Sequence, residues 1–116
     1  MRTSTRARER GKMRRAARFL YAYGSVDRVG RVHHMKCCVP GCEYHSVNAH
    51  IKRDGLGLKS HWSKVVNLCD LHHQLLDHTY GSVERFDREY GTDLNAVAKA
   101  LALSHPPHPG YYDEVI

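Results

Sequence analysis

The sequence predicts a small α+β fold, in which a metal-stabilised β-hairpin and helix follow a basic N-terminal arm and precede further helices. Three observations lead to this prediction. All four cysteines and six of the ten histidines lie within residues 37–78, in pairs whose spacing suits a tetrahedral metal site. Two short apolar segments in the same region are typical of strands, and apolar residues recur at helical spacing downstream.

The length of 116 residues predicts one domain, and a structural metal would supplement its modest core. Composition divides the chain into three parts. Residues 1–30 form a basic arm, partly helical or disordered, 31–103 form the main domain, and 104–116 form an extended proline-rich tail. Within the arm, a helix over 12–23 is expected to stop at Gly24.

The charge is concentrated at the N-terminus and indicates a polyanionic partner. The net charge is +6, and residues 1–36 hold 11 of the 18 Lys and Arg but only 2 of the 12 Asp and Glu. No apolar run reaches membrane-spanning length, and no secretory signal is recognisable. An Arg-rich organelle transit peptide is an alternative interpretation of the arm, as is a solubilising tail. A disulfide-stapled secreted domain is the alternative for the cysteines, and a reducing, cytoplasmic compartment is expected instead.

The metal region is expected to contain a hairpin followed by a helix. The strands are predicted over 46–51 and 61–68, with a glycine-containing loop between them. Cys69 is expected to open a helix that ends at about Asp77 or His78. Two more helices are predicted, over 83–90 between the caps Ser82 and Gly91, and over 93–103 with Asp93 as the N-cap.

Two ligand pairs flank this hairpin and predict a structural zinc site. Cys69 and His72 form the second pair, and the first pair is either Cys37 or Cys38 with Cys42. We prefer Cys37, because the four residues between it and Cys42 are centred on Pro-Gly and give an unstrained turn. A knuckle before a hairpin and a second one opening a helix is the treble-clef arrangement.

Histidines beyond this set predict a second, reactive site. His50 ends the first predicted strand and His73 lies in the first helical turn, so the two are expected to face each other across a cleft. A divalent ion held by His73 would stabilise the leaving oxygen of a phosphodiester. His50 would activate water as a general base, because an imidazole titrates near neutrality.

Several motifs resemble those of HNH (ββα-metal) nucleases. They are Ala49-His50-Ile51, Gly57-Leu58-Lys59, the segment from Val65 to His73, and the segment from Phe86 to Leu94. The closest resemblance is to the phage and bacterial branch that includes the RecA-dependent nuclease of phage recombination systems, over about residues 33–102.

The resemblance implies a metal-dependent DNA endonuclease with a structural Zn²⁺ and a catalytic Mg²⁺ or Mn²⁺. By position, it implies zinc ligation by Cys37, Cys42, Cys69 and His72, base catalysis by His50, and catalytic-metal ligation by His73 and His78. Ala49 stands where many HNH enzymes carry an acidic metal ligand, although members of this branch often have Ala there. The chain departs from the branch in carrying Trp62 and Asn67 where Asp and Pro are usual. Its helix histidines are also five residues apart rather than four.

The expected partner is DNA, and a recombinase filament is a further candidate; no membrane association is expected. The alternative function is a non-catalytic zinc module that binds nucleic acid. Phosphate contacts are expected from basic residues and one histidine, namely Arg14, Arg15, Arg18, Lys52, Arg53, Lys59 and His61.

Overall fold

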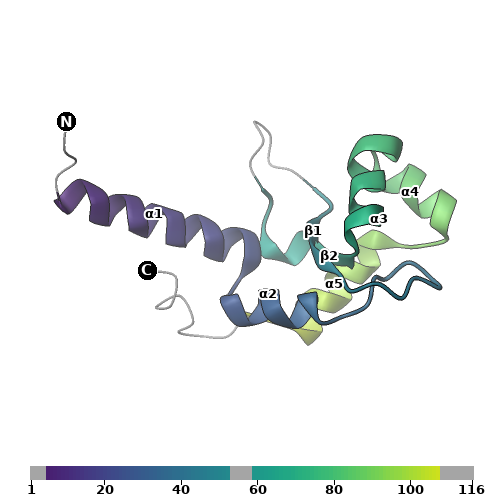
Figure 1. Cartoon of the computed structure of the whole chain (residues 1–116), viewed down its shortest axis with the longest axis horizontal. Coiled ribbons are helices and arrows are strands. Elements are labelled where there is room, and N and C mark those ends of the chain that lie inside the picture. Colours follow the sequence, from purple (N-terminus) through teal and green to yellow (C-terminus); the bar gives the residue numbers. More distant parts are fainter. Residues whose placement is uncertain (1–4, 53–58, 108–116) are drawn as a thin grey trace.

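A computed structural model describes residues 5–52 and 59–107 of the chain (Figure 1). It confirms a small α+β fold with one two-stranded antiparallel sheet. A 3₁₀ helix, η1, precedes the second strand, and a π-helix, η2, continues α3. In chain order the elements are α1 (Thr5–Tyr23), α2 (Val26–His33), β1 (Val47–His50), η1 (Trp62–Lys64), β2 (Val65–Leu68), α3 (Asp70–Gln74), η2 (Leu75–Tyr80), α4 (Val83–Tyr90) and α5 (Leu94–Ser104).

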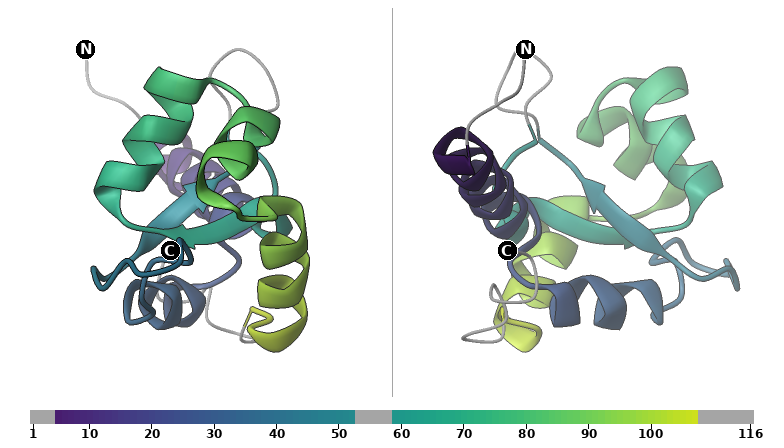
Figure 2. Two further views of the ribbon diagram at one scale, coloured as in Figure 1. Left: turned by 90° about the vertical axis from the view of Figure 1, so that its right-hand side faces the viewer. Right: turned by 60° about the vertical axis from the view of Figure 1, so that its left-hand side comes forward.

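The hairpin lies at the centre of the fold. Its register pairs Val47 with Leu68 and His50 with Val65. Every residue of β2 is buried, so both faces of the strand are covered. Figure 2 shows the hairpin between α3 and α4 on one side and α2 on the other. Both strands are shorter than predicted, and the start of the second predicted strand forms η1 instead.

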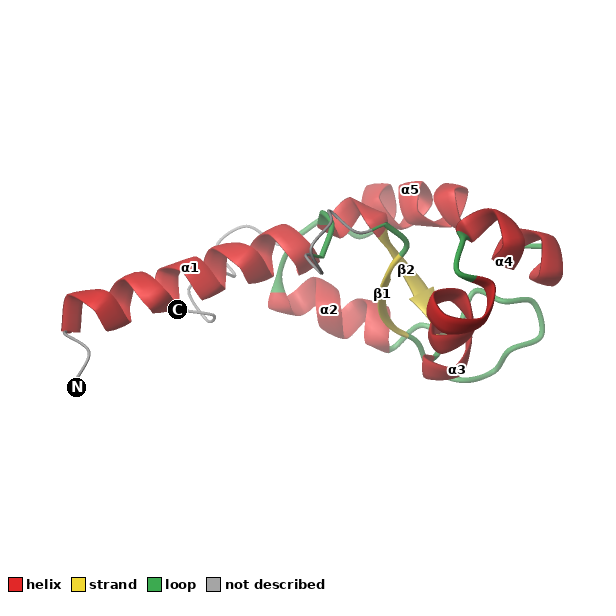
Figure 3. Ribbon diagram, turned by 90° about the horizontal axis from the view of Figure 1, so that it is seen from above, coloured by secondary structure: helices red, strands yellow, loops and turns green. Residues whose placement is uncertain are grey.

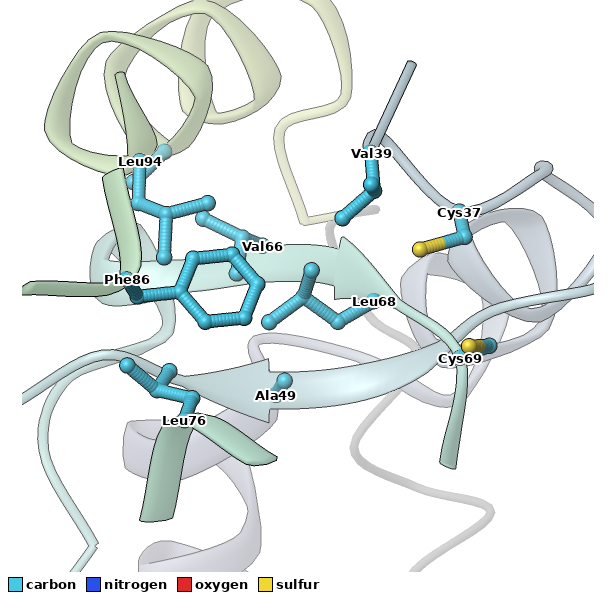
Figure 4. Packing of buried hydrophobic residues seen from close by; sticks show 10 residues of the cluster. Cys37, Val39, Ala49, Val66, Leu68, Cys69, Leu76, Phe86 and Leu94 are labelled. Atoms are coloured by element: carbon cyan, nitrogen blue, oxygen red, sulfur yellow. The ribbon is translucent and has the colours of Figure 1, made fainter. Parts of the chain in front are cut away.

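The larger core packs one face of the hairpin against η2, α4 and α5. Ala49, Val66 and Leu68 meet Leu76 and the other buried residues of this cluster (Figure 4). Its other members are Phe86, Leu94, Ala98, Val39, Cys37 and Cys69. Burying a side chain as large as that of Phe86 contributes about 1.5–3 kcal/mol. Because the two cysteines belong to this core, the metal-ligand region and the apolar core are one continuous unit.

A smaller core covers the opposite face of the hairpin. Val65 packs there with Val32 of α2 and Leu101 of α5. Side chains alternate between the faces of a strand, so Val65 and Val66 point into different cores. The hairpin therefore holds the two helical layers together.

Arg28 is an unusual member of the interior, because it is a fully buried cation. Its Nε donates a hydrogen bond of 2.5 Å to the carbonyl of His105, and its guanidinium lies 5.0 Å from the ring centre of Trp62. Burial lowers the pKa of Arg28 to about 10. Arg31 donates to the carbonyl of Pro106 at 2.8 Å, so two arginines of α2 bind the segment that follows α5.

The C-terminal helices match their predicted limits. The Ser82 hydroxyl accepts from the Arg85 amide, and Gly91 ends α4 with φ 65°. The carboxylate of Asp93 accepts from the Ala96 amide at the start of α5. α5 includes Ser104, the first residue of the predicted extended tail over 104–116, and residues 108–116 lie outside the described residues.

The N-terminal arm is more helical than predicted. α1 begins at Thr5 rather than at residue 12, and it ends at Tyr23 because Gly24 takes φ 85°. α2 was not predicted; Ser25 caps it, and it spans the predicted boundary between residues 30 and 31. Figure 3 shows α1 extending away from the end of the molecule that carries α3 and α4.

Candidate metal centre and candidate cavity site

Three cysteines and one histidine converge beside the end of β2. The segment between α2 and β1 supplies Cys37 and Cys42, and it turns at Gly41, whose φ is 83°. Cys69 directly follows β2 and His72 lies in the first turn of α3. One ligand atom from each of the four side chains lies within 4.8 Å of all the others.

The spacing of these atoms suits a tetrahedral zinc ion. The sulfurs of Cys42 and Cys69 are 3.9 Å apart, and Nδ1 of His72 lies 3.5 Å from Cys37 Sγ and 3.2 Å from Cys69 Sγ. Zinc bonds of ordinary length place two sulfurs about 3.8 Å apart, and a sulfur and a nitrogen about 3.5 Å apart. Cys₃His is also a donor set that structural zinc takes. The four side chains could therefore hold a zinc ion.

Burial controls the protonation of two of these ligands. It raises the pKa of the Cys37 thiol to about 12 and lowers the pKa of His72. A neutral imidazole is the form that binds metal, whereas the buried thiol must lose its proton to do so. Metal binding at this cluster is therefore coupled to proton release.

Cys38 is not a member of the cluster, although it adjoins Cys37. Its half-buried side chain packs against the larger core, and burial raises the pKa of its thiol to about 11. Of the two alternatives that the sequence left open, the structure brings Cys37 to the other three ligands. All four cysteines lie in the described residues, and all are free of disulfides.

A cavity of about 430 Å³ lies where β1 ends and faces η2 and the start of α4. The predicted site residues His50, Lys52 and His78 line it, together with Asp77. The remaining lining residues are Ile51, Leu76, Gly81, Ser82 and Val83. The cavity thus combines two histidines, a carboxylate and a lysine.

The imidazole of His50 is held by the last turn of α1. Its Nε2 lies 2.6 Å from the carbonyl oxygen of Ala22. A carbonyl can only accept, so Nε2 carries a proton and the lone pair of the neutral ring is on Nδ1. The ring of Tyr23 meets the His50 ring edge-on, with 5.2 Å between centroids.

His50 lines the cavity, but His73, which was expected to face it, is not among the lining residues. Instead, Nε2 of His73 lies 3.3 Å from Oδ2 of Asp77, which does line it. Asp77 was not among the predicted site residues. The signal was its position four residues after His73, because residues at that spacing meet on a helix.

His78 is exposed and lines the cavity, although five residues separate it from His73. The π-helix explains this placement. In η2 the Gly81 amide donates to the Leu76 carbonyl at 2.8 Å, a bond between residues five apart. This wider turn reduces the angle around the helix axis that would separate His73 from His78 in an ideal α-helix. Within the described residues, His73 and His78 belong to no group of three metal-ligand side chains.

The predicted phosphate-contact residues occupy several positions. Arg14, Arg15 and Arg18 are exposed on α1, and Lys52 lines the cavity. Nζ of Lys59 lies 5.0 Å from the Tyr23 ring centre. His61 caps η1 and contacts the rings of Tyr21 and Trp62, and Arg53 lies outside the described residues.

Comparison with protein-family models, curated proteins and solved structures gave no significant match. Among the described residues, no helix has both the length and the apolar character needed to cross a bilayer.

Proposed function

We propose that this chain is a metal-dependent HNH endonuclease of the ββα-metal, treble-clef type, which hydrolyses phosphodiester bonds in DNA. The supporting observation is a cavity lined by His50 of the hairpin and by Asp77 and His78 of η2, in a fold whose Cys₃His cluster lies at the other end of the hairpin. The resemblance of the sequence motifs suggests phage or bacterial DNA recombination as the setting, with a recombinase filament as a further partner.

His73 and Asp77 would hold the divalent ion. Their facing atoms are 3.3 Å apart, and adjacent ligands of an octahedral ion with bonds of about 2.1 Å lie about 3 Å apart. A mixed imidazole and carboxylate pair suits Mn²⁺ better than Mg²⁺. When bound, such an ion polarises the phosphate and stabilises the leaving oxygen. Asp77 would thereby supply a carboxylate where position 49 is alanine, and it would serve as the second ligand in place of His78.

His50 would accept the proton of the attacking water at Nδ1. The hydrogen bond to Ala22 places the ring proton on Nε2, so the basic nitrogen is defined. After proton transfer the imidazolium keeps its hydrogen bond to the carbonyl, which disperses part of the new charge. Lys52, on the wall of the same cavity, would contact a phosphate next to the cleaved bond.

The exposed helix α1 would bind the DNA backbone. It carries seven Lys or Arg residues and one acidic residue, Glu9. Its only buried residues are Ala16 and Ala22, so its basic side chains remain available to phosphates. Neutralising several phosphates provides affinity that is independent of sequence and sensitive to salt.

A cleavage assay with purified protein, plasmid DNA and Mn²⁺ or Mg²⁺ tests this proposal. His50→Ala should lower the rate about 100- to 10,000-fold, the usual effect of losing a general base. His45→Ala removes an exposed histidine outside the cavity and should cut as the wild type does. Both variants should retain one zinc per chain. Cleavage by His50→Ala at the wild-type rate would refute the role of His50.

A second candidate is a zinc module that binds nucleic acid without cutting it. It is favoured by the basic surface of α1 and by the absence of an acidic residue beside His50 in the sequence. This candidate predicts salt-sensitive DNA binding, no cleavage with any divalent metal, and one bound ion per chain. Binding of Mn²⁺ that depends on His73 in addition to the zinc would contradict it.

A further inference from the structure

The last turn of the basic helix α1 rests on the part of the hairpin that holds the proposed base. Ala22 accepts the proton of His50 Nε2, and the Tyr23 ring contacts both His50 and Lys59. The neighbouring Tyr21 ring lies 5.2 Å from the ring of His61, at an interplanar angle of 75°. Three consecutive residues of α1 therefore contact three hairpin residues to which the sequence analysis gave functional roles.

The acceptor for His50 arises from the helix terminus. The last four carbonyls of an α-helix have no partner within the helix, and Ala22 is the penultimate residue of α1. Gly24 stops the helix there, with its amide bonded to the Leu20 carbonyl at 2.8 Å. The helix end thus directs a partially negative carbonyl at the imidazole, which favours an N–H at Nε2 in both the neutral and the protonated ring.

Tyr23 fixes the plane of the same imidazole. Its ring is itself held on two further sides, by the Phe19 ring at 5.3 Å and by Nζ of Lys59 at 5.0 Å from the ring centre. An edge-on aromatic contact favours one ring orientation over others. The side chain of Tyr23 and the carbonyl of Ala22 therefore restrain the His50 ring together.

We propose that the last turn of α1 positions His50, with Tyr23 as the positioning side chain. The helix that binds DNA thereby also sets the orientation of the base. This inference rests on the proposed function for its catalytic meaning, but the restraint on the His50 ring exists whether or not the protein cuts DNA. The arm is then part of the reactive site and more than an electrostatic tether.

The restraint is tested by NMR on the full-length zinc-loaded protein, labelled with ¹⁵N in histidine. At a pH of about 8.5, where an ordinary imidazole is neutral, the Nε2–H proton of His50 should be observable and protected from exchange. Tyr23→Ala should expose it to rapid exchange, whereas Tyr23→Phe, which keeps the ring, should preserve it. Equal protection in wild type and Tyr23→Ala would overturn the proposal.

The catalytic consequence is tested by single-turnover cleavage with Mn²⁺ and by DNA affinity measured separately. Tyr23→Ala should slow cleavage of bound DNA about 10- to 100-fold, because misplacing a reacting group has effects of this size. Its DNA affinity should stay within about twofold, and Tyr23→Phe should restore the rate. Tyr44→Ala removes an exposed tyrosine elsewhere and should change neither.

The two readouts separate the possible failures. A wild-type protein that cuts no DNA but shows a protected Nε2–H refutes the nuclease proposal and keeps the positioning role. Loss of DNA affinity with an unchanged single-turnover rate in Tyr23→Ala would refute positioning. If Tyr23→Ala does not fold, Tyr23→Leu replaces it, because leucine fills space without an aromatic ring. Protection of the His50 Nε2–H and a single-turnover rate that both equal those of the wild type in this variant would overturn the proposal.

Discussion

Adjacent cysteines in this chain should respond in opposite ways to substitution by serine. Cys37 lies in the four-residue cluster with its sulfur 3.5 Å from His72 Nδ1, whereas Cys38 lies outside the cluster. Serine is nearly isosteric with cysteine but is a poor zinc ligand. We therefore expect Cys37→Ser to abolish stoichiometric zinc binding and Cys38→Ser to retain one zinc per chain.

The magnitude follows from the position of the cluster. Structural zinc contributes about 10–16 kcal/mol to the folding of small zinc domains, whereas whole domains are stable by only about 5–15 kcal/mol. Cys37 and Cys69 belong to the larger core, so losing the ion also removes support from that core. Cys37→Ser should unfold the hairpin region. Cys38→Ser places a hydroxyl at a half-buried position and should lower the free energy of unfolding by about 1–2 kcal/mol.

Zinc content, measured with a colorimetric chelator after denaturation, and urea unfolding provide the assays. The chain has a single tryptophan, Trp62, and its contact with Arg28 makes its fluorescence a reporter of the folded state. Cys37→Ser should show no cooperative transition. A Cys37→Ser variant that keeps one zinc, together with a Cys38→Ser variant that loses it, would refute the assignment of the ligands.

Two further predictions concern the cavity and the arm. Asp77→Asn should weaken Mn²⁺ binding, measured by calorimetry, at least about tenfold while zinc stays bound. The comparison variant His78→Gln should weaken Mn²⁺ binding less. The reverse order would show that His78 is the ligand. Replacing Arg14, Arg15 and Arg18 together by alanine should reduce the slope of log affinity for duplex DNA against log salt by about 2.7, since each phosphate contact contributes about 0.9. Anisotropy titrations measure this slope. An unchanged slope would mean that these residues do not contact phosphates.

Local signals account for the elements that the sequence predicted well. Ser82, Gly91 and Asp93 are caps whose effect depends on the adjacent helical turn, so the limits of α4 and α5 could be predicted closely. The two ligand pairs, Cys37 with Cys42 and Cys69 with His72, were equally local, since at most four residues separate the members of each pair. These parts needed no knowledge of tertiary contacts.

Tertiary contacts explain what was missed. α2 has only eight residues, with Gly30 inside it, and its stability depends on burying Arg28 and Val32 against distant segments. The π-helix after α3 gives no recognisable pattern in sequence, so the approach of His78 to the cavity was not predictable. Asp77 was not predicted, although its spacing of four residues from His73 is a local signal of contact on a helix.

The bond between Arg28 and His105 also bears on the order in which the protein can assemble. It joins residues 77 positions apart, whereas the zinc ligands span only 37–72. Closing the longer loop costs more chain entropy, so the ligand cluster can form before the junction between α1 and α2 has packed against residues 105–107. At this junction Gly24 lies so near Pro107 that a Cβ atom added to Gly24 would come within 2.7 Å of the proline ring. The contacts of residues 105–107 with Arg28 and Gly24 therefore add to the support of α1 only after these last residues have been synthesised and packed.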